Sequence, residues 1–105
     1  MAKGMGNMLK QAQKLQSKIF KLQEEMADKT VETTVGGGMI RAVANGKQEL
    51  TAIKIEPEVV DPDDVAMLED LILAAVNDAL NKARDMVSEE MTKLAGGLNL
   101  PPGLV

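Results

Sequence analysis

The stretch TVETTVGGGMIRAVANGKQELTAIKI, residues 30–55, decides the fold of this chain. From residue 30 apolar and polar residues alternate with a period of two, as in a half-buried strand. The glycines at 36–38 end that strand, and MIRAVA at 39–44 predicts a second. Asn45-Gly46 is a strong hairpin signal, for which we expect a type I′ turn, and QELTAIKI at 48–55 predicts a third strand. Two tight connections in a row predict a three-stranded antiparallel meander, with one face available for helices.

The segment before this sheet has the pattern of a long amphipathic helix. Its apolar residues recur at spacings of 4-3-4-3-4, which is typical of a helix that packs against another helix. We therefore expect a helix over about residues 5–28. Leu9 and Phe20 fall on a second flank, which indicates more than one neighbour. The apolar seam consists of Met8, Ala12, Leu15, Ile19, Leu22 and Met26.

The segment after the sheet predicts a second, longer helix over about residues 62–95. DPDD at 61–64 resembles a helix start, with Asp61 as N-cap and Pro62 at the first helical position. At 1.5 Å per residue this helix is about 50 Å long, which exceeds the width of the sheet, so its C-terminal part must project or meet another chain. Glu69 lies within the apolar arc of this helix. It serves either the helix dipole or a subunit contact.

Together these segments predict one α+β domain over residues 1–105, an α-β-β-β-α subunit with its sheet at about 30–56 and an irregular tail at 96–105. The chain has 105 residues and one aromatic side chain, Phe20. A domain this small buries only a modest core, so we expect it to oligomerise. Most of the eight methionines recur at helical spacing, which favours core positions over a binding surface.

The composition argues against an enzyme. The chain contains no His, Cys, Tyr or Trp, so the usual general base, metal ligand and nucleophile are missing. The glycine run lacks the spacing of a phosphate-binding loop, and the acids at 61–64 lack the spacing of a calcium loop. We therefore expect no catalysis, cofactor, metal or small-molecule substrate. The N-terminus has no apolar signal-peptide core and no run reaches membrane-span length, which favours the cytoplasm.

Charge is distributed unevenly along the chain. Residues 1–23 carry five lysines and no acid, about +5, whereas the remainder carries 16 acids against seven bases, about −9, which sums to the net charge of −4. At 100° per residue, four of these lysines fall within an arc of about 80°, centred roughly 120° from the apolar seam. The cations before residue 24 are Lys3, Lys10, Lys14, Lys18 and Lys21.

This lysine stripe has two interpretations. A solvated helix face is the commoner reason for charges at i, i+4 and i+8. A solubilising face, however, usually mixes both signs and gains i,i+4 pairs from doing so, so the absence of acids before Glu24 favours a phosphate-bearing partner. No aromatic base-stacking set, zinc finger or clear helix-turn-helix is present. Nucleic-acid binding would therefore be directed at the backbone and sensitive to salt.

Three stretches resemble the YbaB/EbfC family of bacterial nucleoid-associated proteins. They are VGGGMIRAVANGKQELTAIKIEPE at 35–58, MLEDLILAAVNDALNKA at 67–83 and GGLNLPPGL at 96–104. The resemblance implies a tweezer-like homodimer in which long helices project as pincers. It also implies DNA binding that alters DNA conformation, and a cytoplasmic role at the nucleoid in gene regulation and DNA protection.

From the resemblance and the charge pattern, we expect two first helices to contact the phosphates of a duplex. Secondary candidates lie on the second helix. The alternative is a dimeric scaffold whose first helix docks a protein partner through Leu9 or Phe20, with affinity that survives high salt. The DNA-contacting candidates are Lys3, Lys10, Lys14, Lys18 and Lys21, followed by Lys82, Arg84 and Lys93.

Overall fold

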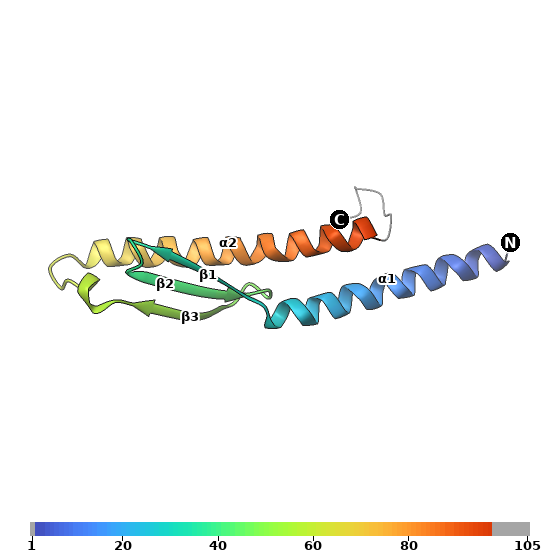
Figure 1. Ribbon diagram of the computed structural model, residues 1–105, viewed down its shortest axis with the longest axis horizontal. Helices are drawn as coiled ribbons and strands as arrows, with labels where there is room; N and C mark the ends of the chain where they lie inside the picture. Colours follow the sequence, from blue (N-terminus) through green and yellow to red (C-terminus); the bar gives the residue numbers. More distant parts are fainter. Residues whose placement is uncertain (1, 98–105) are drawn as a thin grey trace.

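The computed structural model describes the backbone of residues 2–97 and the side chains of residues 4–96. It confirms the α-β-β-β-α order (Figure 1). The prediction of an irregular tail from residue 96 is wrong at its start, because Gly96 and Gly97 still belong to the last helix. The rest of the predicted tail, residues 98–105, lies outside the described residues. The elements are α1 (Ala2–Asp28), β1 (Thr30–Val35), β2 (Ile40–Asn45), β3 (Leu50–Ile55), a short 3-10 helix η1 (Pro57–Val59) and α2 (Val65–Gly97).

The three strands form an antiparallel sheet in the order β1-β2-β3. The prediction of a type I′ turn after β2 is wrong. Asn45 ends the strand, the N–H of Gln48 donates to the Asn45 carbonyl at 3.0 Å, and Gln48 itself has a φ of 56°. A type I turn followed by a left-handed residue is the usual three-residue hairpin loop. The Asn45 side chain stabilises it, because its Oδ1 accepts from the N–H groups of Lys47 and Glu49.

Gly46 has a different role from the one its motif indicates. Its N–H donates to the carbonyl of Met26 at 2.9 Å and to that of Lys29 at 3.2 Å. The last carbonyls of a helix have no partner within the helix, so this loop supplies one for the end of α1. A Cβ on Gly46 would lie 2.6 Å from the Met26 carbonyl carbon and 2.7 Å from its Cβ. A side chain at position 46 would therefore collide with Met26, and only glycine lets the end of α1 pack against the hairpin loop.

The start of α2 also differs from the prediction. Asp61 is not the N-cap; its Oδ1 accepts from the Asp63 N–H at 2.9 Å, within a turn closed by the Asp64 N–H and the Asp61 carbonyl. Pro62 occupies the second position of that turn, which its fixed φ favours. Asp64 then caps the helix, because its Oδ1 accepts from the Met67 N–H at 3.2 Å. The acids thus form a turn and a cap in series, and α2 begins at Val65.

Asp64→Ala is expected to lower the free energy of unfolding by about 1 kcal/mol, because it removes the side-chain acceptor from the first turn of α2. Asp63→Ala is the matched control, since it removes the same charge one residue earlier without removing a cap. Chemical denaturation followed by circular dichroism measures both. Equal losses in the two variants would mean that charge near the helix dipole, and not the cap, is responsible.

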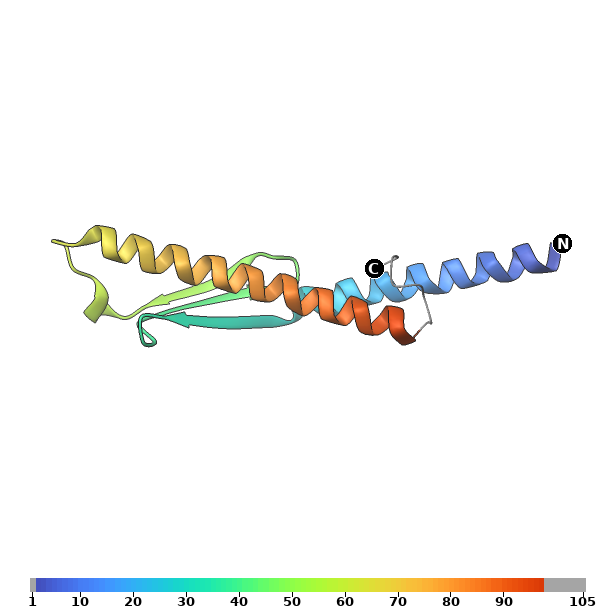
Figure 2. The same cartoon turned by 90° about the horizontal axis from the view of Figure 1, so that it is seen from above.

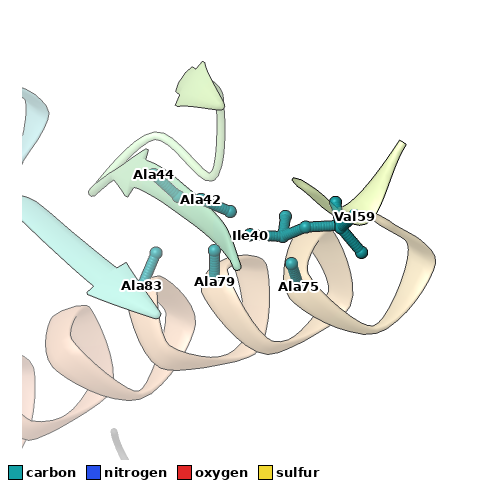
Figure 3. Close-up of a cluster of buried hydrophobic side chains, with 7 residues drawn as sticks. All are labelled: Ile40, Ala42, Ala44, Val59, Ala75, Ala79 and Ala83. Atoms are coloured by element: carbon teal, nitrogen blue, oxygen red, sulfur yellow. The ribbon is translucent and has the colours of Figure 1, made fainter. Parts of the chain in front are cut away.

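The core is small and lies where α2 crosses β2 (Figure 3). Three alanines of α2, spaced four residues apart, face three residues of β2 spaced two apart, and all but one of these six side chains are alanines. The Thr33 hydroxyl of β1 donates to the Ala75 carbonyl at 3.1 Å. Ile40 is the one large side chain among the described residues that is fully buried. The core residues are Ile40, Ala42, Ala44, Val59, Ala75, Ala79 and Ala83.

The described chain is elongated, measuring 74 × 22 × 17 Å with a radius of gyration of 20.0 Å. A compact domain of about 100 residues has a radius of gyration of about 13 Å. Both helices extend beyond the same end of the sheet (Figures 1 and 2). The prediction that the second helix outruns the sheet is therefore confirmed, and α1 projects further still.

Candidate nucleic-acid interface

The four lysines of the stripe whose side chains are described all lie exposed on the projecting part of α1. None of them has a carboxylate within ion-pair distance among the described residues. Lys10 and Lys21 are 11 residues apart in the sequence, which is about 16 Å along the helix axis. Their ammonium groups are therefore available to an external anion. These residues are Lys10, Lys14, Lys18 and Lys21; the Lys3 side chain lies outside the described set.

The structure adds two uncharged residues to the stripe, and the sequence analysis had singled out neither of them. Gln13 and Ser17 line the same shallow, open depression as Lys10, Lys14 and Lys18. Amide and hydroxyl groups donate hydrogen bonds to phosphate oxygens as lysines do, without adding charge. The signal that could have identified them is position, since each lies three or four residues from a lysine on the same helix face.

The lysine stripe ends abruptly at the root of α1. Glu24, Glu25 and Asp28 occupy the last turns of the helix, which contain no basic residue. At 100° per residue Glu25 and Asp28 fall within the same arc as the lysines. A polyanion that follows the stripe is therefore attracted along the distal part of α1 and repelled close to the sheet.

The secondary cations on α2 differ from the stripe because each has an interaction partner within the chain. The Lys82 Nζ donates to the Glu32 carbonyl at 3.0 Å. Arg84 lies 3.7 Å from the carboxylate of Asp85, and Lys93 lies 3.4 Å from that of Glu90. Both ion pairs are exposed and weak, but they lower the positive potential around these cations. The structure thus separates free lysines on α1 from partnered cations on α2.

Three other residues that the sequence singled out, Leu9, Phe20 and Glu69, are all exposed. Leu9 and Phe20 are exposed on their own flank of α1, where no other residue of the described part of the chain covers them. Glu69 is exposed in the second turn of α2, so it bears no burial cost here.

No group of three or more His, Cys, Asp or Glu side chains within the described part of the chain could hold a metal ion. Over residues 2–97, neither helix has a stretch long and apolar enough to cross a membrane.

Comparison with known proteins confirms the resemblance drawn from the sequence. The model of the YbaB/EbfC DNA-binding family matches residues 1–98. A nucleoid-associated protein of Thermoanaerobacter sp. (strain X514) is 61% identical over 97 residues, covering 92% of this chain and 87% of that protein. A nucleoid-associated protein of Pelotomaculum thermopropionicum is 54% identical over 101 residues, covering 96% of each.

A solved structure supports the fold independently. The crystal structure of an uncharacterized protein from Helicobacter pylori matches with a TM-score of 0.59 at 24% identity, covering 80% of this chain and 93% of that one. At this identity the likeness concerns the arrangement of helices and strands alone.

Proposed function

Because the chain belongs to the YbaB/EbfC DNA-binding family, we propose that it binds double-stranded DNA as a homodimer, mainly through backbone phosphates, and alters the conformation of the DNA. In this proposal the protein acts at the nucleoid in the cytoplasm, where it contributes to DNA organisation, gene regulation and DNA protection. The contacting groups are the stripe lysines, with Gln13 and Ser17 as neutral donors.

The observation that carries this proposal is the separation of charge in space. The free lysines lie on the part of α1 that projects beyond the sheet, while the acids that make the whole chain −4 are carried from Glu24 onward. A local positive field on a projecting element attracts a polyanion, although the net charge is negative. The acidic remainder keeps the DNA away from the body of the protein and limits indiscriminate binding.

The homodimer is supported by the size of the core. Its buried members are mostly alanines, and burying an alanine removes little apolar surface from water. A chain of this length with such a core gains stability from association. Two copies would present two stripes, which doubles the number of phosphates within reach.

DNA binding of the purified protein is expected to fall steeply with salt. A dimer carries ten lysines before Glu24, two copies of the five in each chain. If half of them contact phosphate at once, the slope of log affinity against log salt is about −4 to −5, at roughly 0.9 per contact. Fluorescence anisotropy of a labelled duplex at several salt concentrations gives this slope, and a value near zero would contradict the proposal.

A second candidate function is favoured by one observation, the exposure of Leu9 and Phe20 on a flank of α1 that the lysines do not occupy. An exposed aromatic side chain on a helix is a typical anchor for a protein partner. In this alternative the chain is a dimeric scaffold, and the lysines only solvate the helix. The same titration separates the two functions, because a scaffold shows no salt-dependent affinity for the duplex.

A further inference from the structure

The apolar seam of α1 is covered at its root and open towards its tip. Met26 is only 3% exposed, and Leu15, Ile19 and Leu22 are half-buried in the part of α1 that lies beside α2. The second helix then ends, whereas α1 continues beyond it in both views (Figures 1 and 2). The seam is therefore longer than the helix that covers it.

Three residues form the open part, which we call the distal seam. They continue the spacing of three and four residues, so they lie on the same side of α1 as the covered part. Met5 and Met8 are 73% and 71% exposed, and no other residue of the described part of the chain covers them. Adjoining exposed apolar side chains of this kind mark a contact surface. The distal seam consists of Met5, Met8 and Ala12.

We infer that the distal seam is the docking surface for a segment of this same chain, residues 98–105. This tail segment follows α2 and lies outside the described residues. Its apolar groups would pack along the open end of α1. The groups that carry the contact are three leucines, called the tail leucines: Leu98, Leu100 and Leu104.

Position and reach favour the tail segment as the occupant. The second helix ends at Gly97, beside the middle part of α1 (Figures 1 and 2), so the segment begins where the cover of the seam stops. The uncovered distance from Leu15 to Met5 is ten residues of helix, about 15 Å. The eight residues 98–105 in an extended conformation span about 25 Å, at about 3.1 Å each. The segment is therefore long enough to follow the distal seam to Met5.

The composition of the tail segment favours the same assignment. Residues 98–105 include three leucines, a valine and two prolines, and no charged side chain. Prolines restrict the unbound chain, so ordering this segment costs less conformational entropy than ordering a flexible one. A segment attached to the chain also has an effective concentration of about millimolar, which a separate partner rarely reaches.

Docking of the tail segment leaves the lysine stripe available. The stripe is centred roughly 120° around α1 from the apolar seam, so the segment would lie on a different side of the helix from the lysines. The segment would connect the projecting ends of α1 and α2, which have no other link beyond the covered part of the seam within the described residues. This role is separate from the proposed DNA binding and does not depend on it.

Methionine oxidation by dilute hydrogen peroxide tests the inference, because a docked segment shields the thioethers of Met5 and Met8. Replacing the tail leucines by serine should accelerate the oxidation of both methionines at least about threefold. A segment docked for about two-thirds of the time leaves about one-third of the molecules open, and only these react. Mass spectrometry of peptides follows each methionine, and Met67, which is 41% exposed on α2, is the internal reference. The test variant is Leu98→Ser, Leu100→Ser and Leu104→Ser.

The matched control replaces the same three leucines by isoleucine. Isoleucine keeps the apolar surface, so Met5 and Met8 should stay protected as in the wild type. The oxidation rate of Met67 should be the same in all three proteins. Equal rates for Met5 and Met8 in the wild type and the serine variant would overturn the inference, whether both methionines are open or covered by something else.

A spin label then decides whether the segment docks on its own chain. The chain has no cysteine, so Gly103→Cys gives a single site for a nitroxide. Labelled, nitrogen-15-enriched chains diluted into an excess of unlabelled wild type should show broadened signals from residues 5–12. Enriched chains without a label, mixed with labelled ones, should not. Broadening at residues 5–12 in the second mixture alone would place the segment on a second copy and overturn the assignment. Neither experiment contains DNA, so its failure is distinct from a missing salt slope.

Discussion

Replacing Lys10, Lys14 and Lys18 by glutamine is expected to weaken DNA binding by roughly two to three orders of magnitude near 0.1 M salt. If half of the six altered side chains in a dimer contact phosphate at once, three contacts are lost. The salt slope should then fall by about 2.7, at roughly 0.9 per contact. Glutamine keeps the helix propensity close to that of lysine, so the fold should be unaffected. Salt titration of a labelled duplex measures both affinity and slope.

The matched control removes the same number of cations from α2. In this control, Lys82, Arg84 and Lys93 are all replaced by glutamine. Each variant loses three positive charges per chain, so the net charge of both changes from −4 to −7. Because these cations already have partners within the chain, their loss should change DNA affinity far less. Light scattering checks that both variants keep the mass of the wild type. Equal losses of affinity would mean that net charge governs binding and that the stripe is only a solvated face.

Gly46→Ala is expected to lower the free energy of unfolding by about 2 to 4 kcal/mol, the largest effect we predict for a single methyl group. The added Cβ would overlap backbone and side chain of Met26, and overpacking of this kind costs about 1 to 3 kcal/mol. Separating the two segments also weakens the hydrogen bond from the Gly46 N–H to the Met26 carbonyl, which contributes about 1 kcal/mol. Urea denaturation of the variant measures the loss.

The same substitution at Gly6 serves as the control for Gly46→Ala. Gly6 lies in α1 with nothing within 4 Å of an added Cβ. Because alanine is the better helix former, Gly6→Ala should stabilise the chain by a few tenths of a kcal/mol up to about 1 kcal/mol. Opposite signs are therefore expected from one chemical change at two sites. A Gly46→Ala variant as stable as the wild type would show that the loop does not root α1.

Local patterns predicted the elements well but not every residue's role. The alternation at Val31, Thr33 and Val35 is determined by burial on one face, so it identified β1 correctly. The Asn45-Gly46 pair located the hairpin but not its turn type, because contact with Met26 decides why a glycine is there. Similarly, the acids before α2 indicated that one of them caps the helix, but the sequence pointed to Asp61 and the cap is Asp64. Tertiary contacts of this kind cannot be predicted from the local sequence pattern.

The candidate site was predictable to the extent that it depends on charge. The lysines could be assigned to one face because helical geometry converts sequence spacing into direction. The same spacing places Gln13 and Ser17 beside the lysines, but it is a weaker signal for them, since neutral side chains are common on any exposed helix. Charge distribution along the sequence ranked the α2 cations below the stripe, but it did not show that they have partners within the chain. That distinction comes from partners such as the Glu32 carbonyl, which is distant in the sequence and adjacent to Lys82 in the fold.

Because α1 is attached to the sheet only at its C-terminal end, a small tilt of the helix displaces the lysines by a large distance. Met26 is buried against the hairpin, and Lys10 lies 16 residues away, about 24 Å along the helix. Tilting α1 by 10° about its root would therefore move Lys10 by about 4 Å while breaking few contacts. In the proposed homodimer, such a tilt would change the spacing between the two stripes without rearranging the sheet. If the chain binds DNA as proposed, the same lysines would therefore stay in contact with duplexes of different curvature.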